Sequence, residues 1–242
     1  MNNEEIAGVR AACKIAKETL DFITDKVAPG VTAKHLNDLC AQFFESQGAE
    51  SACLHKNFPE KTCISINEVV CHGVPNNRII YPEDLVNIDV AVYYKGYYGD
   101  TARTFCMPEC SKINQQLCEI TKNARDAGIA KIRHGAYIGD IGHAISMYVK
   151  KNSNFSIISN FCGHGIGKEL HQYPQIPNTG VPGNGNRLLN GMMITVEPVI
   201  SAGKPENIIL SDGWTAITCD KSFTAQWEHT ILVTSTGYEI LT

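Results

Sequence analysis

Apolar positions near the N-terminus repeat at alternating spacings of three and four residues, which places them on one face of a helix. Asn2 or Asn3 can cap this helix, and Pro29-Gly30 ends it. A second helix follows, with Thr32 as its cap and Gly48 after its last turn. The apolar face of the first helix is Ile6, Val9, Cys13, Ala16, Leu20, Ile23 and Val27, and that of the second is Leu36, Leu39, Cys40, Phe43 and Phe44.

The pattern then changes to short β-branched and alternating segments, which are typical of strands. Strands are predicted at 62–66, 85–94 and 97–105, and later at 193–199 and 227–233. Between these groups, Ile113, Leu117, Ile120 and Ala124 predict a helix that runs towards Gly135. Asp140 can cap one more helix, with Ile141, Ile145 and Val149 inside it.

The order of elements is therefore helix, helix, strands, and then the same again. Pro29-Gly30 and His134-Gly135 stand at matching points of the two halves, which suggests an internal duplication. Helices grouped before strands favour an α+β arrangement with a largely antiparallel sheet.

Composition narrows the class of protein. The 242 residues fit one domain, 1–242, and the 43% of apolar residues is ordinary for a globular protein. The formal charge is 21 − 25 = −4 without a basic cluster, so we expect no nucleic-acid specificity.

No apolar run reaches the ~20 residues of a membrane span. The start Met-Asn-Asn-Glu-Glu has no signal-peptide pattern, so the ten cysteines are interpreted as reduced thiols of a cytoplasmic protein.

Two aspartates lie in the predicted hairpin. If Lys95-Gly96 forms a two-residue turn, Ala91 pairs with Asp100. Asp89 shares the face of Ala91, so the two aspartates are diagonal neighbours about 7–8 Å apart at the backbone. Carboxylates this close repel each other unless a cation offsets the repulsion. The alternative is that both aspartates are solvated near strand ends.

A glycine-rich segment and two isolated glutamates add further candidates. His164 stands between Gly163 and Gly165, where it is either a metal ligand or a surface residue of a glycine turn. Glu197 and Glu228 each interrupt an apolar run, and a Glu in such a run is seldom buried unless it is paired or bound to a metal. The alternative is an exposed Glu on the polar face of the strand. Strand alternation directs His229 away from Glu228.

In combination, these segments resemble the short, type I bacterial methionine aminopeptidases over nearly the whole chain. The matching segments are Cys63-Ile64-Ser65-Ile66-Asn67-Glu68-Val69-Val70-Cys71-His72-Gly73, Asn87-Ile88-Asp89-Val90, Gly99-Asp100-Thr101, Gly163-His164-Gly165-Ile166-Gly167, Thr195-Val196-Glu197-Pro198 and Gln226-Trp227-Glu228-His229-Thr230. The resemblance implies the pita-bread fold, with two pseudo-symmetric halves around a central antiparallel sheet covered by helices.

The resemblance also implies the site. It assigns five ligands for two divalent ions (Co, Mn, Fe or Zn), namely Asp89, Asp100, His164, Glu197 and Glu228. It implies that His72 and His171 contact the substrate and the developing oxyanion, and we expect Glu197 to shuttle the proton. Cys53, Phe58, Cys63 and Trp214 match the family's pocket for the methionine side chain.

The implied activity is removal of the N-terminal methionine from nascent proteins whose second residue is small. A monomer with loose ribosome association is expected. The chain departs from the family at residues 54–58, which are one residue short, at Leu170 and at Asn178-Thr179, so the shape of the pocket stays open. The alternatives are a prolidase-like Xaa-Pro peptidase, a non-catalytic binding protein of the same fold, and a cysteine hydrolase.

Overall fold

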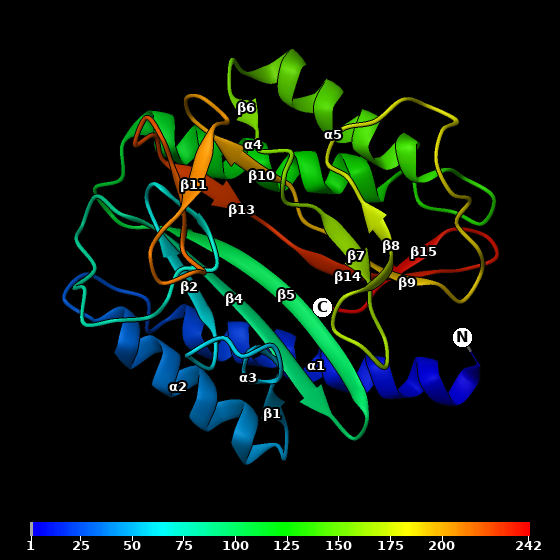
Figure 1. Cartoon of the computed structure of the whole chain (residues 1–242), viewed down its shortest axis with the longest axis horizontal. Coiled ribbons are helices and arrows are strands. Elements are labelled where there is room, and N and C mark those ends of the chain that lie inside the picture. Colours follow the sequence, from blue (N-terminus) through cyan, green and yellow to red (C-terminus); the bar gives the residue numbers. More distant parts are fainter. Residues whose placement is uncertain (1) are drawn as a thin grey trace.

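The computed structural model describes residues 2–242, and its helices lie on both sides of its strands (Figure 1). In this view α1 and α2 lie below the strands and α4 and α5 above them. The helices are α1 (Asn3–Thr24), α2 (Ala33–Ser46), α3 (Ala52–His55), α4 (Lys112–Ile129) and α5 (Ile138–Asn152).

Local capping explains where the helices begin. The Asn2 side chain accepts a hydrogen bond from the backbone of Glu5, and that of Thr32 accepts one from His35, as predicted. The first helix ends at Thr24, so Val27 lies beyond it. The predicted cap at Asp140 is wrong: α5 begins after Tyr137, and the Asp140 carboxylate accepts from the Tyr137 N–H from inside the first turn.

The first half of the chain forms a four-stranded antiparallel sheet. β4 (Leu85–Tyr94) pairs along its whole length with β5 (Tyr97–Cys106), and Ala91 stands opposite Asp100, which confirms the predicted register. The remaining strands of this half are β1 (Glu50–Ser51), β2 (Cys63–Ile66) and β3 (Val69–Cys71); β1 and β2 pair with β4.

The second half contributes a five-stranded sheet in the order β15-β14-β9-β7-β8, and two three-stranded sheets, β13-β10-β6 and β11-β12-β3. These strands are β6 (Ser156–Ile157), β7 (Gly163–Gly165), β8 (Gln172–Ile176), β9 (Met193–Val196), β10 (Val199–Ser201), β11 (Asn207–Ile209), β12 (Ala216–Thr218), β13 (Thr224–Gln226), β14 (His229–Val233) and β15 (Tyr238–Ile240).

Two of the predicted strands are shorter than expected. The strand predicted at 193–199 is divided into β9 and β10, and the strand predicted at 227–233 begins only at His229. Pro198 has no N–H to donate, so it cannot continue a central ladder. The two breaks leave Glu197 and Glu228 outside regular strands.

A separate apolar core lies under each layer of helices. α1 and α2 pack on β4 through Leu20, Leu36 and Val90, whereas α4 and α5 pack on β9 and β14 through residues such as Ile145 and Ile194. The α+β prediction is confirmed. Seven of the ten cysteines are buried, as free cysteines commonly are.

The helix pairs of the two halves are connected in the same way. Gly30 and Gly135 both have positive φ, at 91° and 83°, a conformation that glycine adopts without strain. Two residues further on, Thr32 and Tyr137 each form an isolated antiparallel bridge. The matching geometry supports the internal duplication that the sequence suggests. No helix among residues 2–242 is both long enough and apolar enough to cross a membrane.

Candidate metal centre

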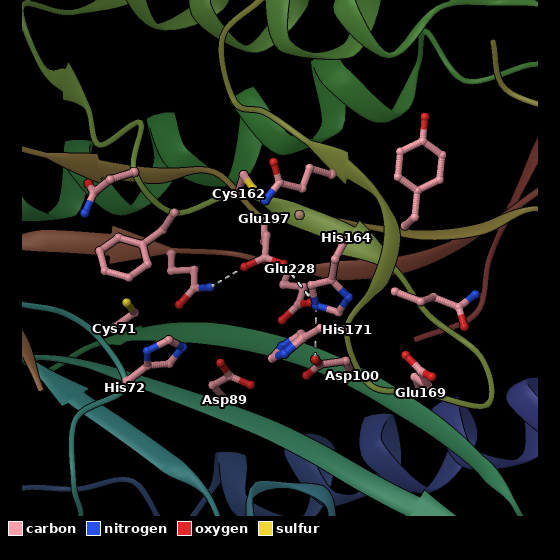
Figure 2. A pocket seen from close by; sticks show the side chains of 17 residues that line it. Cys71, His72, Asp89, Asp100, Cys162, His164, Glu169, His171, Glu197 and Glu228 are labelled. Atoms are coloured by element: carbon pink, nitrogen blue, oxygen red, sulfur yellow. Dashed lines mark hydrogen bonds and ion pairs between the residues drawn. The ribbon is translucent and has the colours of Figure 1, made fainter. Parts of the chain in front are cut away.

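The five predicted ligands line one cavity of about 610 Å³ between the two halves. Asp89 and Asp100 lie on β4 and β5, and His164 lies on β7. Glu197 lies between β9 and β10, and Glu228 between β13 and β14. Figure 2 shows the two aspartates on one wall, facing the two glutamates and the imidazole.

The breaks in the strands place the glutamates. Pairing of β9 with β14 stops at Val196 and His229, and pairing of β10 with β13 starts again at Val199 and Gln226. The two gaps therefore face each other, and each holds one glutamate. In a continuous strand, alternation alone would decide which face of the sheet each glutamate side chain points to.

The donor atoms of the five predicted ligands form two overlapping groups. Oxygens of Asp89, Asp100 and Glu228 lie within 4.8 Å of one another, and so do donor atoms of His164, Glu197 and Glu228. His164 Nε2 is 3.6 Å from Asp100 Oδ2 and 3.5 Å from Glu197 Oε1. Its Nδ1 is 3.0 Å from the carbonyl of Gly165, which leaves Nε2 directed at the carboxylates. Glu228 is the member that the two groups share.

The carboxyl groups of this cavity are electrostatically strained without a cation. Burial raises the pKa of Asp89, Asp100, Glu197 and Glu228, and the charges of neighbouring carboxylates raise those of Asp89 and Glu228 further. Asp100 Oδ1 and Glu228 Oε1 are buried without a hydrogen-bond partner. Buried carboxylate oxygens without a hydrogen-bond partner, beside an imidazole, fit a divalent cation. Such a cation would coordinate these oxygens and offset the repulsion between the carboxylates.

Two further imidazoles, those of His72 and His171, line the same cavity as the predicted ligands. Burial lowers the pKa of His72, whose ring is 5.8 Å from that of Phe161 and whose φ is 52°. Burial, and then the neighbouring His164, lower the pKa of His171 to about 3. The His171 ring centroid is 4.4 Å from that of His164, and one of its nitrogens lies within 4.8 Å of Asp100 and His164 donor atoms. Both rings are thus neutral near pH 7.

Hydrogen bonds hold the Glu197 carboxylate from both sides. The Thr195 hydroxyl donates to Oε1 at 2.7 Å, and the Gln226 amide donates to Oε2 at 3.2 Å. The sequence pattern predicts no role for Thr195 or Gln226. Strand alternation could have found Thr195, because it lies two residues before Glu197, whereas nothing local indicates that Gln226 faces it.

A smaller cavity of about 60 Å³ opens beside the first one and shares His72, Asp89, Asp100 and His171 with it. The four residues predicted for a methionine pocket, Cys53, Phe58, Cys63 and Trp214, all line it. The rings of Phe58 and Trp214 meet edge to face at 5.4 Å. Lys56, Ala91 and Leu170 complete the wall. Of these three, only Leu170 was singled out by the sequence.

Comparisons with known proteins point to one family. Residues 7–235 match metallopeptidase family M24. The methionine aminopeptidase of Rickettsia prowazekii is 49% identical over 97% of this chain and 91% of that protein. The methionine aminopeptidase of Escherichia coli K12 is 40% identical over 99% of this chain and 91% of its own length.

Solved structures agree. The match to the crystal structure of the Rickettsia prowazekii methionine aminopeptidase covers 100% of this chain and 98% of that chain, with a TM-score of 0.97 and 47% identity. That of the Thermotoga maritima enzyme gives the same coverage and TM-score at 36% identity. A prolidase from Pyrococcus horikoshii shares the fold at 23% identity, and the match covers 62% of that chain. The pita-bread fold expected from the sequence is confirmed.

Proposed function

This chain belongs to metallopeptidase family M24, and we propose on that basis that it is a methionine aminopeptidase. It would hydrolyse the bond after the N-terminal methionine of nascent proteins whose second residue is small. The observation that carries the proposal is the convergence of four carboxylates and one imidazole beside a small cavity lined by sulfur and aromatic groups. A thioether side chain suits such a lining.

The cofactor of the proposed reaction is a pair of divalent metal ions held by the five predicted ligands. Two groups of donor atoms that share Glu228 support two ions rather than one. When bound, such ions lower the pKa of water and polarise a carbonyl group. Oxygen and nitrogen donors without a thiolate suit Co, Mn, Fe or Zn.

The protein's own side chains would move the proton and stabilise charge. Glu197 is our candidate for taking the proton of the attacking water and delivering it to the leaving amine. The hydrogen bonds from Thr195 and Gln226 fix both of its oxygens during that transfer. His72 and His171 are neutral, so each can donate one N–H to the oxygen on which charge develops.

The substrate's methionine would enter the smaller cavity. Cys53, Phe58, Cys63 and Trp214 form its walls, and the same cavity reaches Asp89 and Asp100. A methionine side chain seated there brings its own carbonyl to the metal ligands. This adjacency would select methionine as the residue before the cleaved bond.

We also propose that residues 1–242 act as a single catalytic domain and as a monomer. Asp89 and Asp100 come from one half of the chain, and His164, Glu197 and Glu228 from the other, so neither half holds the set alone. Because the proposed substrates are nascent chains, we infer a cytoplasmic protein in loose association with ribosomes.

A peptide assay tests the proposal directly. Met-Ala-Ser should be cleaved, chelation should abolish the cleavage, and restoring each metal in turn should identify the active ones. Ala-Pro peptides serve as the comparison, because a prolidase-like enzyme of the same fold would prefer them. Activity that survives complete chelation would instead favour a nucleophilic cysteine, and failure to bind any divalent ion would favour a non-catalytic protein.

A further inference from the structure

A second cavity, of about 350 Å³, lies behind the metal centre. Trp227 and His229 line it, whereas Glu228, between them in the chain, lines the metal-centre cavity. On the neighbouring strand β5, Thr101 and Arg103 also line this rear cavity. Residues of β5 and of the segment 227–229 thus line both the rear cavity and the proposed catalytic cavity.

Cationic side chains from three elements gather in its wall. α1 supplies Lys17, β5 supplies Arg103, and α4 supplies Lys122 and Arg125. No described aspartate or glutamate lines this cavity, although Asp21 and Asp126 pair with cations of its wall from outside it. A cavity lined mainly by one sign of charge concentrates counter-ions.

The two cations on α4 have hydrogen-bond donors without a partner among residues 2–242. Arg125 is only 4% exposed, yet its Nε and Nη2 both donate to the same oxygen, Asp126 Oδ1. Its Nη1 has no hydrogen-bond partner within residues 2–242. Lys122 forms no ion pair with the described residues, and its ammonium lies 5.3 Å from the centroid of the Trp227 ring.

Lys17 and Arg103 share one carboxylate. Lys17 Nζ lies 2.5 Å from Asp21 Oδ2, and Arg103 Nη2 lies 3.0 Å from Asp21 Oδ1. His229 lines the same cavity as the four cations, and its Nδ1 lies 3.0 Å from the Thr242 hydroxyl.

We propose that this rear cavity binds a small multivalent oxyanion of the phosphate or sulfate class. Such an ion would accept hydrogen bonds from Arg125 Nη1 and from Lys122, neither of which has a hydrogen-bond partner among residues 2–242. It would also offset the mutual repulsion of the four cations. Neither the metal centre nor the methionine pocket uses any of these four side chains, so the inference goes beyond the proposed function.

Sulfate is the probe of choice for the metal-loaded enzyme, with ionic strength held constant by sodium chloride. Saturable binding in calorimetry and a rise in melting temperature with sulfate are expected. Lys122→Ala combined with Lys17→Ala should weaken binding about tenfold or more. Lys150→Ala combined with Lys151→Ala removes the same charge from the exposed end of α5 and should leave binding unchanged.

Crystals grown with selenate would locate the ion by its anomalous signal. A peak between Lys122 and Arg125 is expected, and inorganic phosphate and phosphoserine, compared by calorimetry, would distinguish a free ion from a phosphate ester. The proposal is overturned if wild-type protein shows no saturable binding at constant ionic strength. It is equally overturned if the Lys17/Lys122 double variant binds as tightly as wild type, or if selenate occupies the metal centre alone. None of these outcomes depends on peptidase activity.

Discussion

The Thr195 hydroxyl connects two of the predicted metal ligands. It donates a hydrogen bond to Glu197 Oε1 at 2.7 Å and accepts one from the His164 backbone N–H at 2.9 Å. Thr195 is fully buried, so no solvent competes for either bond. The hydroxyl therefore fixes the Glu197 carboxylate relative to the strand that carries His164.

Replacing this hydroxyl should slow turnover without weakening substrate binding. Thr195→Val is expected to lower kcat about tenfold or more, because a hydrogen bond to a charged group contributes about 1.5–3 kcal/mol. KM for Met-Ala-Ser should stay near the wild-type value. Thr195→Ser keeps the hydroxyl and should restore most of kcat. Equal losses in the Val and Ser variants would assign Thr195 a packing role instead.

Glu197→Gln tests the proposed proton shuttle. The amide retains the size of the carboxylate but cannot accept the proton, so kcat should fall about 100-fold or more. Circular dichroism should report an unchanged fold. Glu206→Gln, at an exposed position, is the matched control and should keep full activity. A Glu197→Gln enzyme with wild-type turnover would refute the assigned role.

The sequence predicts the first half of the site well because the relevant geometry is local. A two-residue turn at Lys95-Gly96 fixes the register of the hairpin, and that register places Asp89 and Asp100 on one face. The helix caps at Asn2 and Thr32 depend on equally short-range chemistry.

The second half of the site depends on contacts between distant segments. Nothing near Glu197 in the sequence shows that the break at Pro198 lies opposite the break before His229, and that coincidence places both glutamates. Local pattern predicts continuous strands there, because the flanking residues are apolar and β-branched. Only the family resemblance united His164 with the glutamates, and their role as ligands stays a prediction.

Asp84 should make the free energy of unfolding depend on pH in the acidic range. Burial acts to raise its pKa, but hydrogen bonds from Arg78, the Tyr81 backbone and Asn67 outweigh burial and hold the pKa below its usual range. A lowered folded-state pKa gives stability that is present above the unfolded value near 3.8 and is lost as pH falls through the folded one.

The variant Asp84→Asn should therefore lower the free energy of unfolding by about 2 kcal/mol at pH 7, since Arg78 loses its partner while staying partly solvated. Urea denaturation at pH 7 and pH 3 measures the difference. The gap between variant and wild type should narrow as pH drops below about 4. A gap of constant size at both pH values would show that the loss comes from packing.

Leu170 should control how tightly the first residue of the substrate fits. It is 4% exposed and lines the 60 Å³ cavity with Phe58 and Trp214. Leu170→Ala removes atoms from that wall, so methionine would lose contacts while bulkier side chains gain room. The preference for methionine over phenylalanine peptides, measured as the ratio of their kcat/KM values, should therefore fall about tenfold. A change of this size is typical when an apolar pocket gains or loses the space of a methylene group.

Leu54→Ala is the matched control for this change, because Leu54 is 46% exposed and does not line the small cavity. It should leave the preference for methionine unchanged. The measurement is kcat/KM for Met-Ala-Ser and Phe-Ala-Ser with both variants at saturating metal. If Leu170→Ala kept the wild-type preference, the first residue would have to bind outside this cavity, and the assignment of Cys53, Phe58, Cys63 and Trp214 to the methionine pocket would fail with it.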